Sequence, residues 1–155
     1  PPRADFLKLC DGLADEVYAR RVTLAGGLRE LLAALGARGV KVGLASSSPR
    51  PWVDQVLDRF SLRSFFGALA TGDETPGRVK PEPDLYLLAA SRLGVEPRHC
   101  VAVEDSRYGV AAAKAAGMRC LALRGPDNAG QDLSKADAEI PALSGSLDVL
   151  LGQQA

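Results

Sequence analysis

Two adjacent carboxylates follow a short apolar run in the second half of the chain. Glu104 and Asp105 come directly after Cys100–Val103, a run of strand length. Carboxylates in such a place are costly to bury unless they are paired or bound to a cation. Mg²⁺ suits them, because it takes one or two carboxylates and fills its other positions with water and substrate phosphate. The alternative is that Asp105 or Ser106 caps a following helix.

Three consecutive serines end another apolar run. Val40–Ala45 leads into Ser46, Ser47 and Ser48, and Pro49 is compatible with the first turn of a helix. A serine hydroxyl beside free backbone N–H groups at a helix N-terminus can hold an anion, which the helix dipole also favours. The alternative is that one of the serines only caps the helix.

One lysine lies in a loop that is stiffened by prolines. Pro81 disfavours helical backbone at Lys80, and Pro83 restricts Glu82 in the same way. A stiffly mounted ammonium group is suited to hold a fixed charge against a phosphate or a carboxylate. The alternative is a solvated loop lysine, which is the usual fate of this residue type.

Apolar runs alternate with helical patterns along the chain. Strands are expected at 40–45, 67–71, 100–103, 119–123 and 139–140, and helices at 4–22, 28–35, 52–60, 83–93, 108–116 and 147–151. Because the strands are apolar without strict alternation, the pattern predicts an α/β fold: a mostly parallel, Rossmann-like sheet with helices on both faces. Ligands bind at the carboxyl ends of such strands, where the residues described above are expected.

Composition excludes several classes of protein. The chain has 155 residues, 19 basic and 19 acidic side chains and one histidine, which suits one domain without a basic patch for nucleic acid or a membrane surface. No apolar run approaches the ~18 residues of a membrane span. Three scattered cysteines are too few for a disulfide framework and indicate a reducing, cytoplasmic setting.

The order of the motifs resembles the haloacid dehalogenase (HAD) superfamily of phosphotransferases. Leu44–Pro49 is similar to its second motif, Val79–Tyr86 to its third, and Val103–Met118 to its fourth. The resemblance extends from about Leu24 to the C-terminus. It is greatest to the subgroup that contains beta-phosphoglucomutase and small sugar-phosphate phosphatases, and it implies an HAD core with part of a helical cap.

The resemblance also implies roles for the residues. Ser46 would bind a phosphoryl oxygen through its hydroxyl, helped by the Ser47 amide. Lys80 would neutralise the phosphate and hold the nucleophilic carboxylate, so Ser46 and Lys80 would both be catalytic. Asp105 would ligate Mg²⁺, with Glu104 as a direct or indirect partner. These roles fit phosphoryl transfer, which depends mainly on positioning and on stabilising charge.

The first motif of the family, Asp-x-Asp-Gly-Thr, has no counterpart in this sequence. We therefore expect residues 1–24 to be the last part of a helical cap with its linker, and residues 25–155 to be an HAD-like core without its first, central strand. In the family that strand lies between the strands that here end at Ser46 and Asp105. The nucleophile would then lie outside this chain, which would be inactive alone.

The leading interpretation is a Mg²⁺-dependent phosphatase that acts on a small phosphorylated metabolite, above all a sugar phosphate, through an aspartyl-phosphate. A phosphomutase that uses the same site is one alternative, and a non-catalytic remnant that binds phosphate or a partner is another. A nucleotide-binding domain fits the alternation of elements, but no Gly-x-Gly-x-x-Gly follows a strand. The sequence does not indicate the substrate or the oligomeric state.

Overall fold

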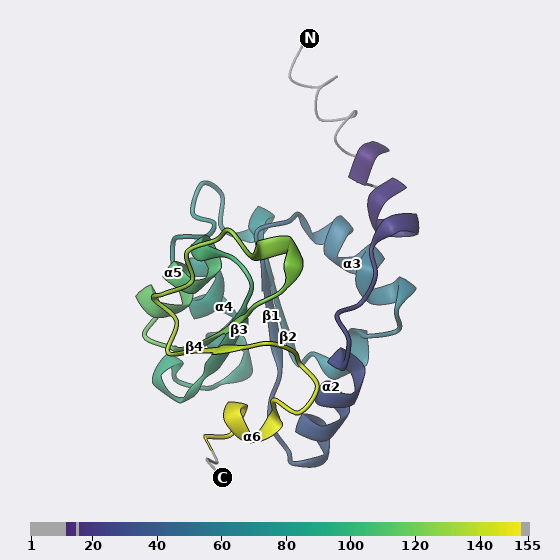
Figure 1. Ribbon diagram of the computed structural model, residues 1–155. Helices are drawn as coiled ribbons and strands as arrows, with labels where there is room; N and C mark the ends of the chain where they lie inside the picture. Colours follow the sequence, from purple (N-terminus) through teal and green to yellow (C-terminus); the bar gives the residue numbers. More distant parts are fainter. Residues whose placement is uncertain (1–11, 15, 153–155) are drawn as a thin grey trace.

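The computed structural model describes residues 12–14 and 16–152, which form an α/β fold of parallel strands and flanking helices (Figure 1). The strands are β1 (Gly43–Ser46), β2 (Ala68–Thr71), β3 (Val101–Glu104), β4 (Arg119–Leu123) and β5 (Ala138–Ile140). The α-helices are α2 (Leu28–Ala37), α3 (Arg50–Arg59), α4 (Asp84–Leu93), α5 (Arg107–Ala115) and α6 (Leu147–Leu150). Short helical turns are η1 (Val17–Arg21), η2 (Arg63–Phe65), η3 (Gly72–Glu74), η4 (Pro97–His99) and η5 (Pro126–Asn128). In this part of the chain, no helix combines the length and apolar character needed to cross a bilayer.

The expected elements are confirmed from residue 28 onward, with shifted ends. β1 begins at Gly43 rather than at Val40, because its partner strand begins only at Ala68, which pairs with Gly43. Of the expected helix at 4–22, residues 4–11 and 15 lie outside the described residues; residues 12–14 and 16 are helical, and Val17–Arg21 is a π-helical turn.

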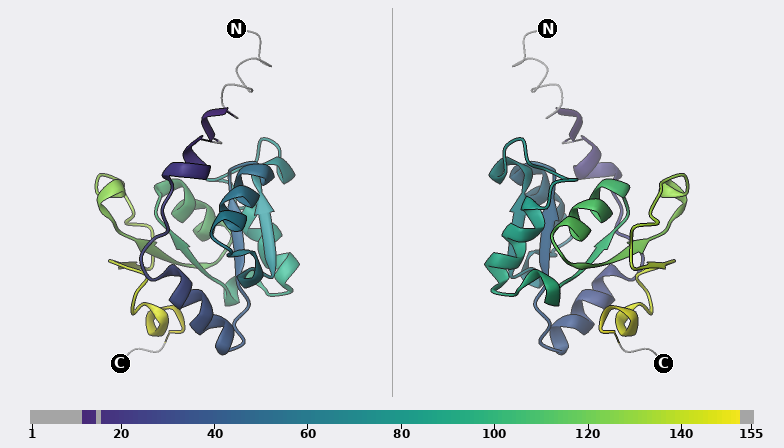
Figure 2. Two further views of the ribbon diagram at one scale, coloured as in Figure 1. Left: turned by 90° about the vertical axis from the view of Figure 1, so that its right-hand side faces the viewer. Right: turned by 90° about the vertical axis from the view of Figure 1, so that its left-hand side faces the viewer.

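The strands form two separate sheets. One contains β1 and β2, the other contains β3, β4 and β5 in that order, and all pairs are parallel. Ser46 pairs with Thr71, and Glu104 pairs with Ala122. Within each sheet, the carboxyl ends of the paired strands therefore lie at the same edge. Figure 2 shows the two sheets set at an angle to one another rather than as one continuous surface.

Each sheet buries one face against large side chains and the other against small ones. Leucine and valine side chains of β1 to β4 face α2, α3 and α6, where the buried clusters contain Leu31, Leu57, Leu121 and Ile140. Alanines and a cysteine on the opposite face pack against α4 and α5, in clusters that contain Ala70, Ala102, Cys120, Leu85 and Val110. Helices therefore cover both faces, and the small residues let α4 and α5 approach the strands closely.

Two helices connect the sheets. In α2, Leu31 packs against β4 and β5, whereas Leu32 packs in the cluster of β1 and α3. In α4, Leu85 packs with the β2 residue Ala70, whereas Tyr86 packs with β3 and β4. Between these helices and the edges of β1 and β3 lies a mainly apolar cavity of about 890 Å³. Side-chain packing on both faces thus holds together two sheets whose facing edges share no strand pairing in the described chain.

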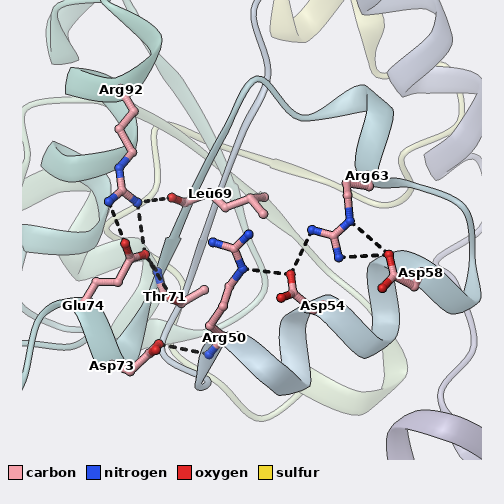
Figure 3. Close-up of polar contacts among 9 residues, drawn as sticks. All are labelled: Arg50, Asp54, Asp58, Arg63, Leu69, Thr71, Asp73, Glu74 and Arg92. Atoms are coloured by element: carbon pink, nitrogen blue, oxygen red, sulfur yellow. Dashed lines mark hydrogen bonds and ion pairs between the residues drawn. The ribbon is translucent and has the colours of Figure 1, made fainter.

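The loop after β2 supports the start of α3 (Figure 3). Asp73 accepts a hydrogen bond from the backbone N–H of Arg50 at 3.0 Å, so this carboxylate caps the helix and no serine does. Gly72 donates its N–H to the Ser48 carbonyl at 3.0 Å. A side chain at Gly72 would place its Cβ 2.2 Å from the Ser47 oxygen, so only glycine allows the two loops to approach this closely.

Glu74 organises the same loop. It accepts hydrogen bonds from the backbone N–H of Thr71 at 2.9 Å and from its hydroxyl at 3.0 Å. Arg92 of α4 binds both carboxylate oxygens of Glu74, at 2.6 Å and 3.0 Å, and also reaches the Leu69 carbonyl (Figure 3). The Arg92 hydrogen bonds are the main reason that the pKa of Glu74 falls to about 2.

We expect Glu74→Gln to lower the free energy of unfolding by about 1 kcal/mol at pH 7, because it removes a surface ion pair that solvent partly screens. The folded-state pKa lies below the ordinary value of 4.5, so the stabilisation is present above pH 4.5 and is lost as the pH falls toward 2. Urea denaturation between pH 7 and pH 2.5 measures this change. The difference from wild type should shrink across that range, and a constant difference would contradict the assignment. Glu30→Gln, at an exposed α2 residue, is the control and should change stability by less than about 0.5 kcal/mol.

Candidate active site

Lys80 and Glu104 form an ion pair at the carboxyl edge of the strands. Lys80 lies in the loop before α4, and Glu104 is the last residue of β3. The Lys80 ammonium contacts Oε1 of Glu104, and the two side chains are only 15% and 7% exposed. A buried carboxylate needs such a partner, because removing either charge would leave the other uncompensated. The structure therefore brings together two of the residues that the sequence predicted for the site.

Tyr86 of α4 is a third member of this cluster, which the sequence did not single out. Its hydroxyl donates a hydrogen bond to the same oxygen of Glu104, and the Lys80 ammonium lies 5.0 Å from the centre of its ring. Burial, followed by the negative charge of Glu104, raises the pKa of Tyr86 far above its ordinary value. The phenol thus stays protonated and acts as a donor. In the sequence, Tyr86 stands only as the last residue of the segment that is similar to the third motif.

The start of α5 is shaped around Glu104. Ser106 caps this helix by accepting the Gly109 N–H at 3.1 Å, so the capping alternative is confirmed for Ser106 but not for Asp105. A Cβ atom at Gly109 would lie 1.8 Å from Oε2 of Glu104. Any other residue at this position would force the Glu104 carboxylate to move, because the carboxylate lies against the helix backbone.

Asp105 is exposed, in contrast to Glu104. Within residues 12–14 and 16–152, its carboxylate accepts no hydrogen bond and forms no ion pair, and no cluster of three or more His, Cys, Asp or Glu side chains is present. Two neighbouring carboxylates, one free and one paired with Lys80, are a donor set that fits Mg²⁺. They do not amount to a complete protein cage for a metal.

Ser46 and Ser47 lie at the end of β1, in the other sheet. Ser46 is half-buried and its hydroxyl oxygen accepts the Ser48 N–H at 3.1 Å, whereas Ser47 is exposed. In the described part of the chain, neither serine is hydrogen-bonded to Lys80, Glu104 or Asp105. The serine turn thus ends the sheet of β1 and β2, whereas Glu104 ends β3 of the other sheet.

We expect Tyr86→Phe to lower the free energy of unfolding by about 1–3 kcal/mol, because it removes one donor from a buried carboxylate. Tyr108→Phe is the matched control: Tyr108 is 51% exposed, and its hydroxyl contacts only the neighbouring Arg107 among the described residues. Its loss should change stability by less than about 0.5 kcal/mol. Chemical denaturation of both variants checks the prediction. Equal decreases in the free energy of unfolding would show that the hydrogen bond from Tyr86 to Glu104 does not stabilise the fold more than the exposed Tyr108 hydroxyl does.

The chain matches a known protein family and several known proteins. The haloacid dehalogenase-like hydrolase family matches residues 3–117. Hexitol phosphatase B of Escherichia coli K12 is 41% identical over 122 residues, which is 74% of this chain and 54% of that protein. Phosphoglycolate phosphatase of the same strain is 34% identical over 145 residues, 92% of this chain and 57% of that protein.

Solved structures also match. The crystal structure of CbbY from Rhodobacter sphaeroides in complex with phosphate gives a TM-score of 0.84 at 29% identity, and the match covers 94% of this chain and 66% of that one. The chain spans about half the length of the curated relatives it matches, 54% and 57% for the two phosphatases. The motifs, the parallel fold and these matches lead to one conclusion: the chain belongs to the haloacid dehalogenase-like hydrolase family.

Proposed function

We propose that the complete protein is a Mg²⁺-dependent phosphatase of small phosphorylated metabolites, with sugar phosphates as the first substrates to test. The observation that carries this proposal is the buried Lys80–Glu104 pair beside the free carboxylate of Asp105 at the carboxyl edge of β3. Support comes from the family and from relatives that are themselves a hexitol phosphatase and a phosphoglycolate phosphatase. The shared chemistry is hydrolysis of a phosphate monoester.

The residues of this chain would bind and orient the phosphate. Lys80 offers a positive charge on a loop that Pro81 stiffens, and Glu104 and Tyr86 hold its side chain in place. Ser46 offers a hydroxyl, and Ser47 a backbone N–H, beside the N-terminal end of α3. Positive charge and N–H donors that are already in position stabilise the charge on the phosphoryl oxygens without reorganisation.

Asp105 would hold Mg²⁺, with Glu104 as a direct or indirect partner. When bound, the metal neutralises charge on the phosphate oxygens. The free carboxylate of Asp105 suits direct ligation, whereas one oxygen of Glu104 is already shared by Lys80 and Tyr86. This division of roles follows from the contacts of the two carboxylates.

The nucleophile would come from a strand outside this sequence. The facing edges of β1 and β3, and the apolar cavity of about 890 Å³ between α2 and α4, suit a further parallel strand with apolar side chains on both faces. An aspartate at its carboxyl end would form a bond to phosphorus while the bond from phosphorus to the ester oxygen breaks and that oxygen takes a proton. Water would then release phosphate and restore the carboxylate.

Residues 1–24 would belong to a helical cap and its linker, and residues 25–155 to the core. Under this proposal, the chain alone performs no covalent phosphoryl transfer. A phosphomutase would use the same residues but pass the phosphoryl group to a second hydroxyl of the sugar. The scattered cysteines, of which Cys100 and Cys120 are free, suit a reducing compartment such as the cytoplasm.

We expect the complete protein to release inorganic phosphate from sugar phosphates only when Mg²⁺ is present. Asp105→Asn and Lys80→Ala should each lower kcat/KM by about 100-fold or more, since the first weakens the carboxylate ligand for Mg²⁺ and the second removes the positive charge that would face the reacting phosphate. Asp148→Asn and Lys135→Ala are matched controls at exposed positions and should retain wild-type turnover. Phosphate release, measured colorimetrically with and without EDTA, tests all four variants.

The outcomes separate the alternatives. Unchanged turnover in both site variants would refute the site assignment. Transfer of phosphate between two positions of the sugar, without net release, would identify a phosphomutase. Phosphate binding without turnover of any phosphate monoester would support the non-catalytic remnant.

A further inference from the structure

Asn128 joins the ends of two neighbouring strands through its side chain. It lies in η5, within the loop between β4 and β5, and it is 7% exposed. Its amide nitrogen donates to the carbonyl of Asp105 at 2.7 Å and to the carbonyl of Leu123, the last residue of β4, at 2.8 Å. Its amide oxygen accepts the Gly125 N–H at 2.8 Å. Both donors and the acceptor of the amide are therefore used.

These contacts begin where the backbone pairing of β3 and β4 ends. The last pair in the register is Glu104 with Ala122. Asp105 is the next residue, and its carbonyl receives a side-chain donor instead of a ladder hydrogen bond. The three partners fix the orientation of the Asn128 amide, because the two carbonyls can only accept hydrogen bonds and the Gly125 N–H can only donate one.

A second contact of the same kind holds the other side of this turn. The backbone N–H of Arg107 donates to the side-chain oxygen of Gln131 at 2.9 Å. The β4–β5 loop thus holds the segment from Asp105 to Arg107 by a hydrogen bond at each end, one from Asn128 and one to Gln131. Among the described residues the Asp105 carboxylate accepts no hydrogen bond and forms no ion pair, so its position depends on how its backbone is held.

We propose that Asn128 is a positioning residue that orients Asp105 for Mg²⁺ binding; this rests on the proposed function, in which Asp105 ligates the metal. A carboxylate that ligates a metal binds more tightly when its direction is set in advance, and loss of such supporting contacts typically weakens metal affinity by about 10–100-fold. A buried amide with all its hydrogen bonds to backbone is well suited to this task, because it cannot rotate without breaking several bonds at once. Asn128 touches neither substrate nor metal in this scheme.

The test compares two side chains that brace β4 at opposite ends. Asn128→Ala removes the brace beside Asp105. Asp137→Ala removes the hydrogen bond that Asp137 accepts from the Cys120 N–H at 2.7 Å, near the start of β4 and at the end remote from the site. Asn128→Asp is a second variant, which keeps the shape and the acceptor for Gly125 but loses both donors. Mg²⁺ affinity of the complete protein is measured by calorimetry without substrate, and thermal unfolding is recorded for each variant.

We expect both Asn128 variants to raise the Mg²⁺ dissociation constant by about tenfold or more. Asp137→Ala should lower the unfolding temperature but leave the Mg²⁺ dissociation constant within about twofold of wild type. A merely structural role for Asn128 would lower the unfolding temperature in the same way without changing metal affinity, and that result would overturn the proposal.

Two further outcomes distinguish this proposal from the proposed function. If the wild-type protein binds Mg²⁺ and the Asn128 variants bind it more weakly, but no phosphate ester is hydrolysed, then the proposed function fails and the role of Asn128 stands. If the wild-type protein binds no Mg²⁺, both fail. Should neither variant fold, the side-chain amide resonances of Asn128 in the wild-type protein give the answer: a shift on saturation with Mg²⁺ supports the proposal, and unchanged resonances refute it.

Discussion

The buried ion pair between Lys80 and Glu104 joins the two halves of the molecule at the carboxyl edge of the strands. Lys80 precedes α4, which packs against β1 and β2, whereas Glu104 ends β3 in the other sheet. No strand pairing joins the two sheets in the described chain, so α2, α4 and this pair connect them. A carboxylate that is 7% exposed needs its cation, and this requirement sets the distance between the Lys80 loop and the end of β3.

Around this pair, the polar residues are held by loops that follow other strands. The serine turn after β1 rests on Gly72 and Asp73 after β2, and the turn after β3 rests on Asn128 after β4. Parallel strands make this possible, because their carboxyl ends come to the same edge and one loop can brace the next. Under the proposed function, a phosphate that binds there would meet groups that are already oriented, which is the condition for electrostatic stabilisation in phosphoryl transfer.

At two positions near the carboxyl edge of the strands, glycine allows other atoms to approach the backbone closely. At Gly72 the loops after β1 and β2 touch, and at Gly109 the Glu104 carboxylate lies on the first turn of α5. In both places a single added carbon would overlap an oxygen atom. The spacing of elements at this edge is therefore limited by a backbone oxygen at Gly72 and by the Glu104 carboxylate at Gly109. Gly109 could be found from its motif, because the glycine forms part of the fourth motif at Val103–Met118.

The sequence by itself determined the class of fold, most strands and helices, and the residues at the ends of the strands, because apolar runs, prolines and glycines act over a few neighbouring positions. It also pointed to the family, through the order of three motifs. Only the tertiary structure decided that Asp73 rather than a serine caps α3, that Tyr86 shares Glu104 with Lys80, and that Asn128 holds the Asp105 carbonyl. The physical reason is distance along the chain: hydrogen bonds between residues far apart in sequence leave no periodic pattern, so they become visible only when the strands bring their ends together.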